Sequence, residues 1–324
     1  VLTGLTALAP NAETFVGLQF VARAFAVGEA ILATVVIVEE FGAEHRGWGV
    51  GALGAIQACG AGFASILYGF VEVLPFGWRS LYLVGLVPLV LLTYWRRTLP
   101  ETDRFAGLQR APKRTTMLMS ARPILLLLQR YPRRFWALAV AVLVTAAAGS
   151  TALFFAPKYM QDAHGWTPAG VAVLTLVGGA FAIVGNPAAG WLSDTYGRRP
   201  VTAVFALCLS VFAMLLYSAS GVVLSGLWMG LIFFHLGTSV TESTYSAEMF
   251  PTAQRGTATG ARNLFSNLGA ICGLSAVSAL YPILGSNWTG VAILGATCLL
   301  VPLVVLIWLP ETARRSLEDI APES

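Results

Sequence analysis

Long apolar runs separated by short polar breaks dominate this sequence. Residues 48–71, 135–157, 166–193 and 200–241 contain no charged side chain, and residues 263–310 continue without charge for 48 positions. A membrane-spanning helix needs about 20 mostly apolar residues, so each run predicts one or two spanning helices. The apolarity is continuous, whereas barrel strands alternate. The pattern therefore predicts an all-α membrane protein.

The breaks between the runs predict nine full transmembrane helices and one stub at residues 1–9. We expect the full helices at about residues 14–38, 48–71, 78–95, 135–157, 167–189, 200–218, 221–244, 257–281 and 288–309. The sequence starts at Val1 inside an apolar run, without Met or a basic leader segment. This start indicates an N-terminally truncated chain rather than a signal peptide.

Composition supports a lipid environment. Hydrophobic residues make up 56% of the chain and charged residues only 11%, with a mean hydropathy of +0.73, whereas soluble domains carry about 25% charged residues. Four cysteines (Cys59, Cys208, Cys272 and Cys298) fall in predicted helices without a CxxC spacing. We therefore predict no disulfide, no metal site and no cofactor.

The positive charges are concentrated in one segment. Ten of the 20 Lys and Arg residues lie between Arg96 and Arg134. The positive-inside rule places that segment, and with it the C-terminal tail, in the cytoplasm of a multi-pass protein of the cell membrane. Because this topology accounts for the net charge of +4, the charge does not indicate binding to nucleic acid.

The chain nearly repeats itself. EEFGAEHRG at 39–47 aligns with EMFPTAQRG at 248–256, and LPETDR at 99–104 with LPETAR at 309–314, at almost the same offset. Such repeats are typical of secondary transporters built from two halves with the same helix order. We predict an incomplete first bundle at 1–95, a basic linker at 96–134, a six-helix bundle at 135–309 and a tail at 310–324. The intact protein would have twelve helices, of which the first two and most of the third are missing here.

The stretch GWLSDTYGRRP at 190–200 places one aspartate and two arginines between two long apolar runs. It resembles the G-x-x-x-D-R/K-x-G-R/K-R/K motif of the major facilitator superfamily, except that Thr195 replaces a basic residue. The two E-x-x-x-x-x-x-R-G segments and the LPETARRSLEDI sequence resemble the sugar-porter branch and the related metabolite–proton symporters. The motif residues are Gly190, Asp194, Gly197, Arg198 and Arg199.

The resemblance implies that these helix-end charges hold one face of the transporter closed while the other is open. Gly190 would let two helices approach closely, and Asp194 would accept hydrogen bonds from the N-terminus of a neighbouring helix. The alternative is that the arginines only anchor a cytoplasmic loop. The same two interpretations, gating or ordinary capping, apply to Glu39, Arg46, Glu248 and Arg255.

Polar residues inside predicted helices are candidates for substrate and proton binding. Glu29 and Glu242 are proton-carrier candidates, because burial favours the neutral form of a carboxyl group. Arg23 is a candidate partner of Glu29 or of a substrate carboxylate, and His235 shares a helix face with Glu242. Gln57, Thr151, Asn263 and Asn267 are candidates to line a cavity. Arg262 is expected near a membrane edge, with an extended side chain.

Recognition of hexoses is where the resemblance weakens. Sugar porters carry Q-Q-x-x-G-x-N in the seventh helix of the complete fold, whereas this chain reads TAAAGST at 145–151. The amides that would bond sugar hydroxyls are absent, so an embedded Arg and Glu suit an organic acid or a zwitterion better than a sugar.

These features together predict a monomeric secondary transporter of a small polar metabolite, an organic acid or a sugar, driven by proton symport with alternating access. A proton-driven efflux antiporter, a non-transporting sensor and an inactive fragment of the same fold stay open as alternatives. No clustered His or Asp motif indicates an enzyme.

Overall fold

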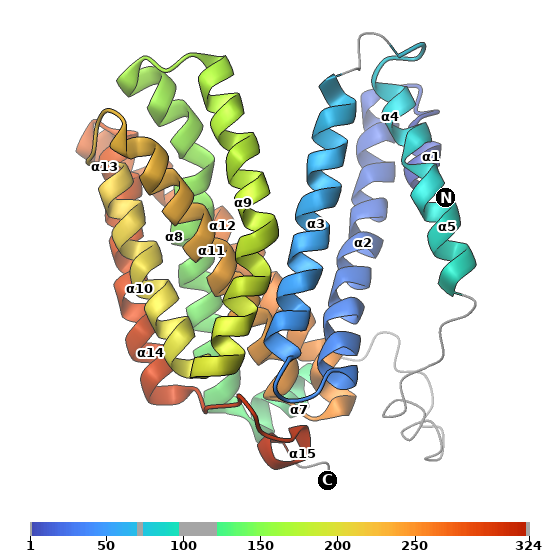
Figure 1. Ribbon diagram of the computed structural model, residues 1–324, viewed down its shortest axis with the longest axis vertical. Coiled ribbons are helices and arrows are strands. Elements are labelled where there is room, and N and C mark those ends of the chain that lie inside the picture. Colours follow the sequence, from blue (N-terminus) through green and yellow to red (C-terminus); the bar gives the residue numbers. More distant parts are fainter. Residues whose placement is uncertain (1, 70–73, 97–121, 322–324) are drawn as a thin grey trace. The chain divides into compact units, whose positions relative to one another are not determined.

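The computed structural model describes residues 2–69, 74–96 and 122–321, and in these ranges every regular element is helical (Figure 1). LPETDR and most of the basic linker lie outside them. The helices are α1 Leu2–Thr6, α2 Ala12–Glu40, α3 Arg46–Gly69, α4 Trp78–Val84, α5 Leu86–Arg96, α7 Arg122–Arg130, α8 Pro132–His164, α9 Pro168–Tyr196, α10 Arg198–Leu216, α11 Val223–Glu248, α12 Thr252–Leu284, α13 Asn287–Thr297, α14 Val301–Trp308 and α15 Leu317–Ile320.

Helices occur at all the positions where the apolar runs predict them. Within the described residues, seven helical stretches are long and apolar enough to cross a membrane: α2, α8, α9, α10, α11, α12 and the stretch from α13 to α14. The remaining predicted spans correspond to α3 and to the pair α4 and α5.

Two predicted helices are interrupted, in both cases just before a proline. The expected helix at 78–95 divides at Gly85 into α4 and α5, three residues before Pro88. The last expected helix passes through a 3₁₀ turn at Cys298–Leu300 before Pro302 in α14. Proline has no N–H and clashes with the carbonyl four residues earlier, which explains breaks at these places.

The chain divides into two compact units, described here separately. One contains residues 1–33 and 59–113, and the other contains residues 34–58 and 114–324. In the first unit, the ring of Phe15 packs edge-on against Trp78 and Tyr82, with centroids 5.4 and 5.9 Å apart. Arg79 donates a hydrogen bond of 3.1 Å to the carbonyl of Ala9, which ties α4 to the turn that follows α1.

Helix α8 is the centre of the second unit. It contacts α11, α12, α13 and α14, and one face of it is a stripe of small buried residues that includes Ala141, Ala148 and Ala152. Its closest packing is with α12, where a Cβ on Gly269 or Gly273 would overlap the carbonyl oxygens of α8. Small residues let the two backbones approach, as is usual between membrane helices.

Gly269→Ala tests this close approach. The added methyl group would overlap the carbonyl oxygen of Leu143, which is backbone and cannot turn away. Overpacking of this kind costs about 1–3 kcal/mol, so the thermal unfolding midpoint in detergent should fall. Gly256→Ala in the same helix is the control, since nothing lies within 4 Å of the added Cβ. Equal midpoints for the two variants would contradict the packing described.

Candidate functional site

A group of buried charges lies where α9, α10 and α11 end or begin. Asp194, Arg198 and Glu248 are exposed by 3%, 0% and 0%, and we call them the charge cluster. One Nη of Arg198 lies 2.6 Å from a carboxylate oxygen of Asp194 and 3.1 Å from one of Glu248, and its Nε donates to the other oxygen of Glu248 at 3.3 Å. The remaining Nη donates to Ser193 at 2.8 Å. Arg198 therefore joins three helices.

Gly197 places Arg198 opposite Asp194. Its φ of +102° ends α9 at Tyr196 and lets α10 start at the next residue. Side chains rarely adopt that backbone conformation. A Cβ would also lie 2.7 Å from the carboxylate of Glu311. The turn thus requires glycine on both conformational and steric grounds.

Asp194 also binds the first turn of α3. Its two carboxylate oxygens accept hydrogen bonds from the backbone N–H of Gly47 at 2.9 Å and of Trp48 at 2.7 Å. Gly190 lies against the backbone of Gly47, with no room for a Cβ. The first-turn amides and the helix dipole favour a negative charge there. The motif led us to expect this contact; its role in gating stays a prediction.

Two further members of the network come from the segment after α14. The carboxylate of Glu311 accepts hydrogen bonds from the backbone N–H of Arg198 at 2.8 Å and of Arg199 at 3.1 Å. The hydroxyl of Thr312 donates to Glu248 at 2.6 Å. Neither residue was among the predicted site residues, although the repeated LPET sequence was a signal. Arg199 itself is half-buried and joins the network through its backbone.

The other predicted helix-end charges form a second connection. Arg255 at the start of α12 lies 3.0 Å from the carboxylate of Glu39 at the end of α2, and it also donates to the carbonyl of Phe250 at 3.2 Å. Arg46, 4% exposed, donates to the carbonyl of Arg315 at 3.0 Å. Glu39 of the first repeat segment and Arg255 of the second therefore form an ion pair with each other.

Glu242 and Arg262 are buried inside the spanning helices α11 and α12, exposed by 3% and 8%. Glu242 accepts a hydrogen bond of 2.7 Å from Thr145 of α8. Arg262 donates to Ser239 Oγ at 2.7 Å and to Asn263 at 3.2 Å. The arginine thus turns toward α11, whereas the sequence led us to expect an extended side chain at a membrane edge.

The remaining candidates belong to α2, α3, α8, α11 and α12. Thr151 is buried against Gly273, and His235 packs on Gly149. Gln57 and Asn267 are exposed. In α2, Arg23 is exposed and Glu29 half-buried. Those two belong to the other compact unit.

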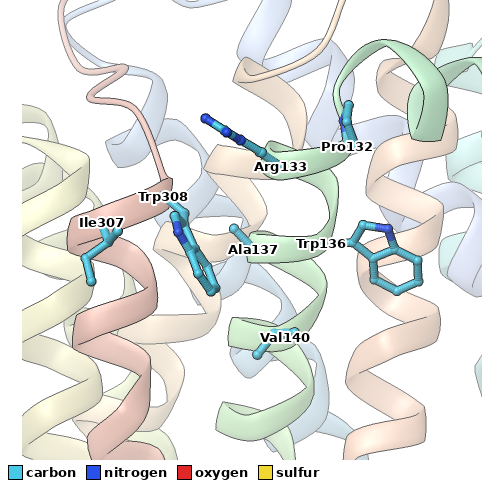
Figure 2. A pocket seen from close by; sticks show the side chains of 7 residues that line it. All are labelled: Pro132, Arg133, Trp136, Ala137, Val140, Ile307 and Trp308. Carbon is cyan, nitrogen blue, oxygen red and sulfur yellow. The ribbon is translucent and has the colours of Figure 1, made fainter.

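A groove of about 630 Å³ opens between α8 and α14, as Figure 2 shows. It contains none of the candidate residues. Trp136 and Trp308 beside it are 52% and 55% exposed, and exposed tryptophans at the ends of spanning helices are typical of the membrane interface. The groove is lined by Pro132, Arg133, Trp136, Ala137, Val140, Ile307 and Trp308.

Comparison with known families decides the membership of the chain. The profile of the Major Facilitator Superfamily matches residues 1–246 and, in a second alignment, residues 180–323. The chain belongs to this superfamily. The superfamily comprises transporters rather than enzymes, and its all-helical membrane fold is the predicted one. Two overlapping matches of one profile also fit a chain with an internal repeat.

Several characterised members of the superfamily are similar in sequence. The proline/betaine transporter of Escherichia coli K12 is 27% identical over 93% of this chain and 63% of its own length. The sialic acid transporter NanX of the same strain is 25% identical over 94% and 73%, and the cis,cis-muconate transport protein of Acinetobacter baylyi 24% over 87% and 68%. The chain thus spans about two thirds of the length of these relatives.

Solved structures share the fold. The proton:xylose symporter XylE bound to 6-bromo-6-deoxy-D-glucose superposes with a TM-score of 0.69 at 18% identity, over 90% of this chain and 70% of that one. A bacterial homologue of the iron transporter ferroportin in an outward-facing state gives 0.65 at 17% identity, over 95% and 80%. At these identities the likeness concerns the fold alone.

Asp194→Asn tests whether the charge cluster stabilises the protein. The change leaves Arg198 with one carboxylate partner and sets an amide against the first turn of α3. Breaking one side of a buried ion pair costs about 3–5 kcal/mol, so the unfolding midpoint should fall strongly. Asp162→Asn is the matched control, because Asp162 is 53% exposed and lies 3.9 Å from Lys158, and such surface pairs contribute about 0–1 kcal/mol. Similar midpoints for the two variants would overturn the assignment.

Proposed function

We propose that this chain belongs to a proton-coupled transporter of a small metabolite that carries a carboxylate. The observation that carries the proposal is the buried pair of ionisable residues, Glu242 and Arg262, in two spanning helices. Ionisable groups at such positions are costly and mark ion or substrate pathways. Because the chain belongs to a superfamily of transporters, we assign this pair to the pathway of the substrate and the proton.

The relatives support the substrate class. Their names state proline or betaine, sialic acid and cis,cis-muconate as substrates, and each of these molecules bears a carboxylate. The TAAAGST segment at 145–151 lacks the amides that sugar porters use for hydroxyls. Sugar transport is therefore the weaker candidate.

Glu242 is the proposed proton carrier. The hydroxyl of Thr145 donates to one carboxylate oxygen of Glu242, and Arg262 interacts with it electrostatically from α12. A carboxyl group inside an apolar bundle exchanges a proton as its surroundings gain or lose water. Proton uptake and release there would follow alternating access.

The charge cluster is the proposed latch of that cycle. Asp194, Arg198 and Glu248 hold the start of α3 against α9, α10 and α11. Opening the protein at this end would separate Asp194 from the amides of Gly47 and Trp48. By the positive-inside rule we assign this end to the cytoplasmic face of a cell membrane, and we propose that a monomer suffices.

Uptake into proteoliposomes tests the transport proposal. The protein is reconstituted and offered radiolabelled L-proline, glycine betaine, N-acetylneuraminate, cis,cis-muconate and D-xylose, with and without an inward proton gradient. We expect at least one carboxylate to accumulate and the gradient to raise its uptake. Substrate expelled against its own gradient on imposing the proton gradient would instead favour the efflux antiporter. Failure of all five probes to move would contradict the proposal.

Glu242→Gln tests the proton carrier. Glutamine keeps the shape and an acceptor for Thr145 but carries no exchangeable acidic proton. We expect accumulation driven by the proton gradient to be lost, while exchange of labelled for unlabelled substrate persists. Glu44→Gln, at an exposed position between α2 and α3, should behave as the wild type. An unchanged response to the gradient in the Glu242 variant would remove Glu242 from this role.

A further inference from the structure

Arg262 is a buried cation whose hydrogen-bond partners are neutral. Its side chain is 8% exposed, and its two Nη groups donate to Ser239 Oγ at 2.7 Å, to the Ser239 carbonyl at 3.2 Å and to Asn263 at 3.2 Å. Its Nε is buried without a hydrogen-bond partner among the described residues. The guanidinium therefore has a donor that remains unused.

A direct carboxylate partner is also missing within residues 2–69, 74–96 and 122–321. The buried arginine Arg198 has two carboxylate partners and Arg255 has one. Arg262 interacts electrostatically with Glu242 but forms no ion pair with it. Burying a charge is costly unless the charge is paired and hydrogen-bonded. This arrangement is that of a site whose anion is supplied from elsewhere.

The surroundings of Arg262 are polar on one side. On α12, Asn263 and Ser266 are half-buried and Asn267 is exposed, at positions one, four and five residues beyond Arg262. Ser266 therefore shares the helix face of Arg262, whereas Asn263 and Asn267, four residues apart, share the neighbouring face. Ser239 and Ser243 of α11 are half-buried as well. Polar side chains in spanning helices face water-filled pathways or other protein segments rather than lipid.

We infer that Arg262, oriented by Ser239 and Asn263, binds the carboxylate of the transported molecule. A hydrogen bond from a guanidinium N–H to a carboxylate oxygen is charge-assisted and therefore stronger than one to a neutral acceptor. Ser239 and Asn263 hold the Nη groups, and Nε is the free donor. The inference rests on the proposed transport function and adds which residue selects the substrate by its charge.

The test compares each carboxylate with its own amide. Binding of L-proline and of L-prolinamide, and of cis,cis-muconate and its diamide, is measured by calorimetry on the purified protein, and uptake on proteoliposomes. In the wild type we expect the carboxylate to bind at least about tenfold more tightly than the amide, because hydrogen bonds to charged groups contribute about 1.5–3 kcal/mol. Arg262→Gln should remove this preference by raising the Kd of the acid about 10- to 100-fold while leaving that of the amide.

Two variants separate recognition from structure. Arg262→Lys keeps the charge but loses the planar fork, so it should restore part of the preference for the acid. Arg133→Gln, at an exposed position beside the groove of Figure 2, should bind and transport as the wild type. If Arg262→Gln misfolds, the lysine variant decides: an unchanged acid-to-amide ratio with lysine overturns the inference.

The outcomes are distinguishable from failure of the proposed function. If the wild type takes up a carboxylate and the Arg262→Gln variant binds that carboxylate with an unchanged Kd, Arg262 is refuted as the anchor. The transport proposal then stays intact. Uptake of D-xylose, with no binding of any carboxylate, would refute both the anchor and the substrate class but not transport. Absence of both binding and uptake for every carboxylate overturns the inference together with the proposed function.

Discussion

The helix ends of the second compact unit depend on the ion pairs that Arg198 forms with Asp194 and Glu248. The guanidinium of Arg198 lies fully buried between the two carboxylates. Each carboxylate is bonded in turn, Asp194 to the first turn of α3 and Glu248 to Thr312. One guanidinium balances only one of two negative charges, and the amides at the start of α3 stabilise the other. Removing Arg198 would leave two buried carboxylates without their cation, which is more destabilising than never having had the pairs.

Asp194 depends in addition on the first turn of α3. Asp194 either binds the amides of Gly47 and Trp48 or must be solvated in another way, since a partly bonded buried carboxylate is expensive. The close contact of Gly190 with Gly47 adds a steric condition, because a Cβ on either residue would overlap the backbone of the other helix. Arg255 and Glu39 repeat the arrangement on α12 and α2. In the proposed latch, a movement of the first turn of α3 would break its bonds to Asp194 together.

Much of the fold follows from the sequence because lipid imposes it. An apolar run of spanning length has to be helical, since its backbone groups have no other partner in a membrane. The contact of Asp194 with the start of a helix could be expected from the motif, because the N-terminus of a helix favours a negative charge. The interruptions before α5 and α14 could not be placed by hydropathy, because hydropathy does not report the missing N–H of proline. Each interruption lies within four residues of Pro88 or Pro302.

The site was less accessible to sequence reasoning. Glu311 lies 113 residues from Arg198, and no local pattern indicates that a tail carboxylate caps α10. Arg262 looked like a residue of the membrane edge, because the sequence does not reveal that Ser239 faces it from α11. By sequence, Arg23 and Glu29 were equally good candidates, because both are charged residues inside a predicted membrane helix. The structure places them in the other compact unit. Pairing across helices depends on rotation about each helix axis, which weak amphipathicity leaves undetermined.

The capping of α10 by Glu311 has a consequence for biosynthesis. Chains are made from the N-terminus, so Gly47, Asp194 and Arg198 enter the bilayer well before the ribosome reaches residue 311. During that interval the amides that begin α10 have no carboxylate, and Glu248 has no hydroxyl from Thr312. Only arrival of the segment after α14 completes the set of bonds, so a nascent chain stalled before that point would lack the contacts that Glu311 and Thr312 make with α10 and α11.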